Sequence, residues 1–450
     1  MRPKNITTFH EFRGYISNGE YKSDPASRFN PQEIKFLRHL SENLIPRGKI
    51  FDIGPDSIRA RNDVGVISFG RHQIEILPKL LGRSGKKSSI IENLTHMLSY
   101  TDKMPVFDNE IGSLSSSQLD FLDIYIKIFA QKLSSALKRG IPHRYIIERD
   151  NLNFIKGKIL IKENIKKNFI QKERIFCEYG SFSENNIINQ TFRSVLEKIL
   201  PLTRNDSIRP KLKHCLRYLA DVKKKNITYH NIKAIKISKA NAHVSEVFEM
   251  AKFFLKGLRQ ELSSGHEKVH AIIFDMNELF EEFIFKFLES KKSILGIKEI
   301  SFQRRKRLIT DVTDLFSNKT SRKGLMDTYL DIFITLKDGK KVIIDTKYKL
   351  LNEDGQHHFN IKNADIYQMC TYQGLYGYEK RPEILLLYPQ NKKSIYKALG
   401  LGGNLDKVLI ANINLHEKLA LNGHNHLVQT FKKILDSISS RDTFEKDLTS

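Results

Sequence analysis

The sequence predicts a multidomain protein of the mixed α/β (α+β) class, with a β-rich N-terminal module, a mixed and largely helical middle region, and a C-terminal α/β core. Its 450 residues exceed the size that one hydrophobic core usually organises. Hydrophobic residues make up 40% of the chain, which is enough to bury such cores. Helix-like and strand-like patterns alternate along the chain. We therefore expect three consecutive segments, at residues 1–142, 143–264 and 265–450.

The N-terminal segment is expected to be rich in β-structure between residues 51 and 81. Short runs of Ile, Val and Leu in this stretch are interrupted by glycine and proline, which favours short strands. Helices are expected at residues 31–44, 86–100 and 119–139. In the last of these, apolar residues recur at a spacing of three and four.

The middle segment is expected to begin with a strand and continue with helices. Residues 144–162 are strand-like around residues 154–160, and helices are expected at residues 189–200, 212–219 and 243–262. Pro201 and Pro210 are expected to separate the first two helices. Lys223-Lys224-Lys225 is expected to be a solvated charge run. Ser263-Ser264-Gly265 ends the last helix, and we place a domain boundary there.

The C-terminal segment has the element order of an α/β nuclease core. Its order is a short apolar run, a helix, an antiparallel hairpin, a second helix, two strands and a last helix. The expected ranges are residues 269–274, 276–290, 330–347, 363–377, 383–388, 408–415 and 423–438. Residues 302–307 form a basic cluster before the hairpin.

The predicted hairpin carries charged residues at one end. Two apolar runs flank the turn sequence Lys-Asp-Gly-Lys at residues 337–340, which is a strong hairpin signal. Asp345 and Lys347 share one face of the second strand, and the antiparallel return brings Asp331 beside Asp345. Buried charges of this kind cost stability unless something uses them, and a divalent metal would.

The net charge predicts a polyanionic partner. Lys and Arg number 75 against 51 acidic residues, for a net charge of +24 and a pI near 9.6, so DNA is the first candidate. The sequence has no run of eighteen apolar residues, so we expect no membrane span. The N-terminal residues lack the apolar core of a signal peptide. The three scattered cysteines have no zinc or disulfide spacing, so we expect a cytoplasmic protein.

Several residues suit metal-dependent hydrolysis of a phosphodiester. Asp331 and Asp345 suit Mg²⁺, with Mn²⁺ as the alternative, and the carbonyl of Thr346 is a candidate third ligand. Lys347 would position or deprotonate the attacking water. Gln368 and Tyr372 lie four residues apart and share one face of their helix. Glu281 is expected to turn inward from the helix before the hairpin and to serve as a further metal ligand. Each residue alone has a simpler explanation, as a solvated turn, a surface carboxylate or a packed aromatic. Their order and spacing together favour a site.

This set resembles a known nuclease superfamily. The pattern Asp331-x13-Asp345-x-Lys347 is similar to that of PD-(D/E)xK nucleases, and Gln368-x3-Tyr372 is similar to the extra motif of their RecB-like branch. The chain also resembles the McrC family, the nuclease subunit of McrBC-type modification-dependent restriction systems. Leu330 stands where the family commonly has proline. The segments that carry the likeness to McrC are residues 60–67, 74–79, 154–160, 177–179, 182–189, 275–281, 345–349, 365–369 and 385–389.

The resemblance implies a metal-dependent endodeoxyribonuclease that works in antiviral defence with a partner. McrC-like proteins join a hexameric AAA+ GTPase ring, McrB, and their N-terminal region stimulates its GTPase by entering the central pore. We assign this contact to residues 1–142. No Gly-x-x-x-x-Gly-Lys-Ser/Thr loop occurs in the chain, so we expect it to bind no nucleotide itself. Two alternatives are a regulatory, DNA-binding adaptor of the ring with weak or no nuclease activity, and a free-standing PD-(D/E)xK nuclease.

Overall fold

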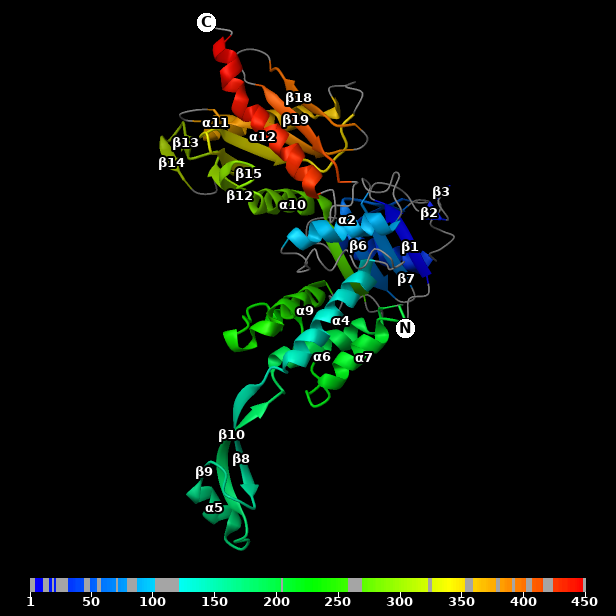
Figure 1. Cartoon of the computed structure of the whole chain (residues 1–450), viewed down its shortest axis with the longest axis vertical. Helices are drawn as coiled ribbons and strands as arrows, with labels where there is room; N and C mark the ends of the chain where they lie inside the picture. Colours follow the sequence, from blue (N-terminus) through cyan, green and yellow to red (C-terminus); the bar gives the residue numbers. More distant parts are fainter. Residues whose placement is uncertain are drawn as a thin grey trace. The chain divides into compact units, whose positions relative to one another are not determined.

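The chain divides into two compact units that are each discontinuous in sequence. The first comprises Met1–Asn5, Ile67–Gln73 and Leu122–Ile272, and the second comprises Ile6–Val66, Ile74–Phe121 and Ile273–Ser450. Both contain helices and strands, which confirms the mixed α/β class (Figure 1). The computed structural model describes residues 5–10, 16–17, 20–21, 31–43, 49–54, 58–69, 72–78, 87–101, 121–203, 205–257, 269–322, 326–352, 359–377, 381–390, 393–401, 407–415 and 424–447. Within these ranges, no helix is both long enough and apolar enough to cross a membrane.

A six-stranded mixed sheet is the centre of the second unit. Its strand order is β12-β15-β16-β17-β19-β18. The pairs β12–β15, β15–β16 and β19–β18 are antiparallel, whereas β16, β17 and β19 run parallel. The parallel strands are almost entirely buried, as their continuous apolar sequences predict. The strands are β12 (Ile297–Arg307), β15 (Asp327–Leu336), β16 (Lys341–Thr346), β17 (Glu383–Pro389), β18 (Tyr396–Leu399) and β19 (Val408–Ile413).

Among the described residues, three helices pack against this sheet. They are α10 (Met276–Ser290), α11 (Asn363–Tyr376) and α12 (His424–Asp447). Helices α10 and α11 both contact β16, and α12 contacts β19. Between β12 and β15 the chain forms a small hairpin, β13 (Val312–Asp314) and β14 (Lys319–Ser321), which pair antiparallel.

Where the structure describes them, the residues before position 102 form short strands and two helices. Helix α2 packs on α10, where Tyr100 contacts the rings of Phe283 and Phe287. A four-stranded sheet has the order β1-β7-β6-β11. These elements are β1 (Asn5–His10), β2 (Ile16–Ser17), β3 (Glu20–Tyr21), α1 (Pro31–Asn43), β4 (Phe51–Ile53), β5 (Ile58–Ala60), β6 (Asp63–Phe69), β7 (His72–Leu77), α2 (Lys87–Tyr100) and β11 (Val269–Asp275).

The first unit is a helical body with a long β-structured extension (Figure 1). Buried aromatic rings hold the body together, and Tyr125 and Phe129 both contact Phe254. The Thr203 hydroxyl donates to Asp123 over 2.5 Å. The helices of the body are α4 (Phe121–Arg139), α6 (Ile187–Ile199), α7 (Arg209–Tyr218), α8 (Tyr229–Ile232), the 3₁₀ helix Lys239–Val244 and α9 (Ser245–Gly257).

The extension, residues 144–183, is named the arm. Strands β8 (Arg144–Leu152) and β10 (Ile175–Ser183) pair antiparallel along its length, and β9 (Lys158–Ile159) and α5 (Ile161–Asn168) lie at its far end (Figure 1). Asn186 and Asn189 fix its base, because both side chains donate to the carbonyl of Pro142. At the tip, the Asn168 amide bonds to Asn151 and to the carbonyl of Arg174. Polar contacts therefore hold a region that has little apolar core.

Gly157 allows two backbone segments of the arm to approach each other closely. Its φ is +70°, and a Cβ there would lie 2.4 Å from the carbonyl oxygen of Glu178. Only glycine fits both conditions, which explains the Lys-Gly-Lys sequence before β9.

The middle region departs from the sequence prediction in three places. Residues 154–157 are not a strand, since β8 ends at Leu152, and α5 was not predicted. Pro210 does not separate helices but lies in the first turn of α7, where its missing N–H costs nothing. The helix predicted from His243 begins at Ser245, after a 3₁₀ turn. The boundary predicted at residues 263–265 falls outside the described residues.

Because of Asp63, we expect the stability of the folded chain to depend on pH. Burial, followed by repulsion from Asp275, raises its pKa to about 7, although Arg61 opposes the shift. Because the folded chain then holds this proton more tightly than the unfolded chain, stability falls as the pH rises from about 4 to about 7. Asp63→Asn should therefore raise the thermal midpoint, by a margin that grows from about pH 5 to about pH 7 and then levels off. The exposed Asp338→Asn should show no such margin, and equal margins for both variants would contradict this origin.

Candidate functional site

The predicted hairpin forms from β15 and β16. Ile332 pairs with Ile344 and Phe333 pairs with Ile343. The turn closes through a hydrogen bond of 2.8 Å from the Leu336 amide to the Lys340 carbonyl, and Gly339 has a φ of +86°. One residue beyond the Ile332–Ile344 pair, the two strands place Asp331 and Asp345 next to each other, as the sequence predicts.

The two carboxylates have different surroundings. Asp331 Oδ2 accepts hydrogen bonds from the Thr346 amide at 2.8 Å and from the Thr346 hydroxyl at 3.0 Å. Asp345 is 1% exposed, and its Oδ2 lies 2.6 Å from Lys347 Nζ. Neither Asp345 oxygen has a hydrogen bond of good geometry from the described residues, so the ion pair leaves the lone pairs of this carboxylate largely unused.

A chain of polar contacts extends from Lys347 to helix α11. Lys347 Nζ donates to Gln368 Oε1 over 3.4 Å, and Gln368 Nε2 donates to the Tyr372 hydroxyl over 2.7 Å. The Tyr372 hydroxyl in turn donates to the Tyr329 carbonyl over 2.8 Å. Since Gln368 and Tyr372 are four residues apart, one helical face supplies both contacts. This arrangement orients Lys347 toward Asp345.

Glu281 lies in α10. This helix precedes the hairpin in the sequence, whereas α11 follows it. Its Oε1 accepts a hydrogen bond of 3.3 Å from Gln303 Nε2 in β12. Gln303 has a φ of +46°, a left-handed conformation that is uncommon for a residue with a side chain. The β12–β15 ladder is interrupted at this position, between the pairs Phe302–Ile332 and Arg304–Leu330. Gln303 therefore faces the part of β15 that carries Asp331.

Burial and mutual repulsion perturb the acidic groups. Burial, followed by the charge of Asp331, raises the pKa of both Glu281 and Asp345 to about 7. Burial also raises the pKa of Asp331, against the hydrogen bonds from Thr346 and the charge of Lys347. Burial lowers the pKa of Lys347, but Asp345 and Asp331 outweigh it, so the net shift is upward. Carboxyl groups held close together with raised pKa values are typical of a site that binds a cation.

The acidic residues fit a divalent ion held by few protein ligands. No three His, Cys, Asp or Glu side chains in the described ranges converge as a ready-made metal cage. Mg²⁺ commonly binds through one or two carboxylates and keeps several waters. Asp331 and Asp345 meet that requirement, and it is favoured by the observation that Asp345 Oδ1 accepts no hydrogen bond from the described residues.

Sequence reasoning did not find three residues at this site. Gln303 lies in a strand whose backbone irregularity has no sequence signal, and Tyr329 contributes only a backbone carbonyl. Asp365 forms an ion pair with Lys349 and lies close enough to Asp345 to raise its pKa. Asp365 begins the Asp-Ile-Tyr-Gln sequence of α11, and its spacing of three from Gln368 was a usable signal.

Gln303 is expected to orient Glu281. Gln303→Ala would remove the hydrogen bond to Glu281 and raise the pKa of that carboxyl further, because the bond lowers it. Gln303→Gly would remove the same bond and relieve the left-handed backbone. We expect both variants to show the same upward shift in the Glu281 pKa by NMR titration of the carboxyl carbon, and Gln303→Gly to be the more stable by about 1 kcal/mol. Unchanged titration would contradict this role.

Comparisons with known proteins agree with the fold. One chain of a structure described as a half-complex from a tetradecameric assembly of Thermococcus gammatolerans McrB AAA+ hexamers with bound McrC aligns with 96% of this chain and 100% of its own, at 17% identity and a TM-score of 0.75. A chain of the Thermococcus gammatolerans McrBC complex aligns with 63% of this chain and 87% of its own, at 21% identity and a TM-score of 0.51. No curated protein sequence matches the chain.

The family comparison covers both units of the chain. Residues 58–389 match the model of the McrBC 5-methylcytosine restriction system component. The match includes the arm, the hairpin and helix α11, and it spans all nine segments that resembled McrC in the sequence. The chain belongs to the McrBC restriction system component family.

Proposed function

We propose that this chain is the Mg²⁺-dependent DNA endonuclease subunit of an McrBC-like restriction system. The observation that carries the proposal is the adjacent pair of the half-buried Asp331 and the buried Asp345, with Lys347 2.6 Å from Asp345 and oriented by Gln368. The same order of Asp, Asp-x-Lys and Gln-x3-Tyr supports a PD-(D/E)xK site of the RecB-like type. The net charge of +24 suits a DNA substrate.

Each residue has a role that follows from its contacts. Asp331 and Asp345 would hold Mg²⁺, with the Thr346 carbonyl as a further oxygen ligand, and the ion when bound neutralises charge on the scissile phosphate. Lys347 would hold the attacking water and stabilise negative charge that develops on the phosphate. Gln368 and Tyr372 keep the Lys347 ammonium in place. Glu281, whose pKa is raised by burial and by the charges of Asp331 and Asp345, would add a further carboxylate to help hold the ion.

Asp345→Asn tests the proposal. The assay combines the full chain with its AAA+ ring partner, GTP, Mg²⁺ and a methylated duplex. We expect the variant to cut at least about 10²-fold more slowly, because it loses a charged metal ligand, and to bind the ring normally. Asp338→Asn, in the hairpin turn and exposed, is the matched control and should cut like the wild type. Cleavage by Asp345→Asn at the wild-type rate would refute the site.

We further propose that the arm is the part that contacts the ring. The matched structures are described as assemblies of McrB with McrC, which supports a ring partner for this chain. In the described part of the first unit, all the large apolar side chains with high exposure lie on the arm. They are Tyr145, Ile147, Phe154, Ile155, Ile161, Ile165, Phe169, Ile170 and Phe182. Such a concentration marks a surface for a protein partner. This proposal moves the contact out of residues 1–142, which the sequence favoured.

A further inference from the structure

A strongly basic surface lies in the body of the first unit. Its residues are distant in sequence from the proposed nuclease residues. Residues 205–240 contain ten Lys and Arg residues but only two acidic residues, Asp206 and Asp221. In the described ranges, Lys211, Lys213, Lys223 and Lys225 are exposed and have no ion-pair partner. Cations crowded in this way repel one another, so the arrangement costs stability unless a polyanion neutralises it.

Three of the cations follow one face of α7. Arg209, Lys213 and Arg217 are spaced by four residues, and they line a hollow of about 670 Å³ together with Asp206 and Pro210. Four residues of helix rise about 6 Å, and phosphates of one DNA strand rise about 3.4 Å each along the duplex axis. The stripe therefore places a cation at about every second phosphate of a strand that lies along it. Arg209 also donates to the Thr203 carbonyl, whereas Arg217 Nη2 lies 3.5 Å from His214 Nδ1 on the same helix face.

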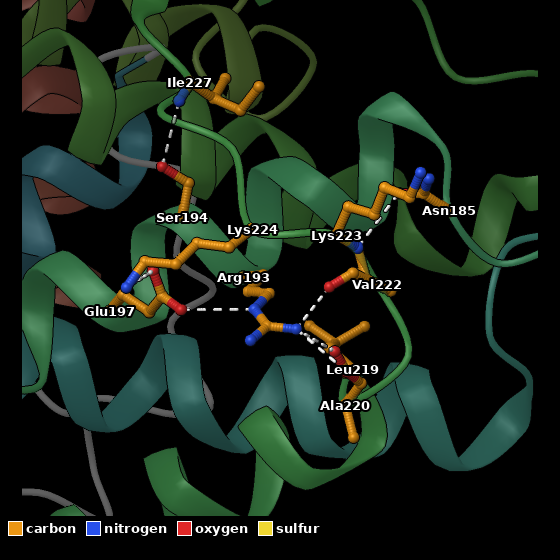
Figure 2. A network of polar contacts seen from close by, with 10 residues as sticks. All are labelled: Asn185, Arg193, Ser194, Glu197, Leu219, Ala220, Val222, Lys223, Lys224 and Ile227. Atoms are coloured by element: carbon orange, nitrogen blue, oxygen red, sulfur yellow. Dashed lines mark hydrogen bonds and ion pairs between the residues drawn. The ribbon is translucent and has the colours of Figure 1, made fainter.

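The lysine run after α7 is held in place by α6. Arg193 Nη1 donates to the carbonyls of Leu219, Ala220 and Val222, at the end of α7 (Figure 2). Glu197 pairs with both Arg193 and Lys224 (Figure 2).

Two side chains fix the rest of this loop. Asn185 accepts from the Lys223 amide, and Ser194 accepts from the Ile227 amide (Figure 2). A charge run that served only to solvate the surface would need no such support. The backbone that carries Lys223 and Lys225 is thereby preorganised, which lowers the entropy lost when these side chains bind a ligand.

We propose that Lys213 and Arg217 of α7, with Lys223 and Lys225 of the following loop, form a basic surface that binds the phosphate backbone of duplex DNA. This inference rests on the proposed function for its choice of DNA among polyanions. The surface contacts phosphates and carries no sequence specificity, because it offers Lys and Arg side chains without a helix or ribbon shaped for base edges. It holds the duplex on the first unit while the second unit carries the cleavage residues.

The test measures binding of a 30-base-pair duplex by the full chain, in EDTA to prevent cleavage, by fluorescence anisotropy over a series of KCl concentrations. We compare Lys213→Gln/Arg217→Gln and Lys223→Gln/Lys225→Gln with the wild type. Lys138→Gln/Arg139→Gln is the matched control, because it removes one Lys and one Arg from the exposed end of α4 in the same unit. Circular dichroism checks that each variant is folded.

Each surface variant should bind at least about tenfold more weakly at about 0.1 M salt and lower the steepness of log K against log salt by about 2. The control should keep the wild-type slope. Surface variants with the wild-type slope overturn this inference, and if Asp345→Asn still abolishes cleavage the proposed function stands. Variants that bind DNA normally but fail to stimulate the ring GTPase would also overturn it, in favour of an acidic protein partner. A wild-type chain that neither binds nor cuts DNA with its partner would refute both.

Discussion

Lys347→Ala is expected to lower the rate of DNA cleavage by at least about 10²-fold while leaving metal binding intact. The ammonium lies 2.6 Å from Asp345 and 3.4 Å from Gln368, so it is held beside a carboxylate that would bind the metal, where it would stabilise negative charge on the phosphate. Losing one preorganised group that stabilises charge in the transition state typically costs this much. Asp331 and Asp345 remain, so the affinity for Mn²⁺ measured by calorimetry should change little.

Measuring metal affinity and cleavage rate separately distinguishes the role of Lys347 from that of the carboxylates. Asp345→Asn should lose both, whereas Lys347→Ala should lose only the rate. Lys337→Ala, in the turn of the same hairpin, removes an exposed lysine and should leave both unchanged. If Lys347→Ala cut DNA as fast as Lys337→Ala, another group would have to activate the water.

Phe169→Ser/Ile170→Ser is expected to abolish stimulation of the ring GTPase without unfolding the chain. These neighbours at the tip of the arm are 78% and 90% exposed, so their removal costs little folding energy and removes apolar area from a protein interface. The GTPase rate of the ring, titrated with each variant, measures the effect.

A matched pair exists in the other unit. Leu315 and Phe316 in the β13–β14 hairpin are also adjacent and are 86% and 104% exposed. Leu315→Ser/Phe316→Ser should stimulate the ring as the wild type does. Equal loss in both variants would indicate a general effect on solubility and contradict the assignment of the arm. A deletion that joins Leu152 to Ile175 through a short turn is a second form of the test, because these residues already pair.

The sequence predicts best those parts of the fold whose signal is local. Helix α10 begins and ends at the predicted residues, and α11 differs by one residue, because apolar periodicity and flanking polar residues mark their ends. The hairpin was readable from its turn and its alternating faces. Its charged end then brought Asp331, Asp345 and Lys347 together from within a single supersecondary motif.

Structure that depends on distant partners could not be predicted in this way. The short helix α5 is mostly polar and is held by the Asn151 side-chain amide of β8 and by the Arg174 carbonyl of the chain before β10. Strand β11 reads as the start of the C-terminal segment but enters a sheet with β1, β7 and β6. The hydrogen bond from Gln303 to Glu281 joins a strand to an earlier helix. It depends on a left-handed backbone conformation at Gln303 that the sequence does not indicate.

The change from antiparallel to parallel pairing at β16 has a kinetic consequence. Strands β15 and β16 are separated by four turn residues, so their pairing closes a short loop and is entropically cheap. Strand β16 meets β17 only after the chain has traversed residues 347–382, including α11. Contacts of such different sequence separation form at different rates during folding. We therefore expect Asp331 and Asp345 to become neighbours in an early local step, and Lys347 to gain the support of Gln368 and Tyr372 only when the slower crossover is complete.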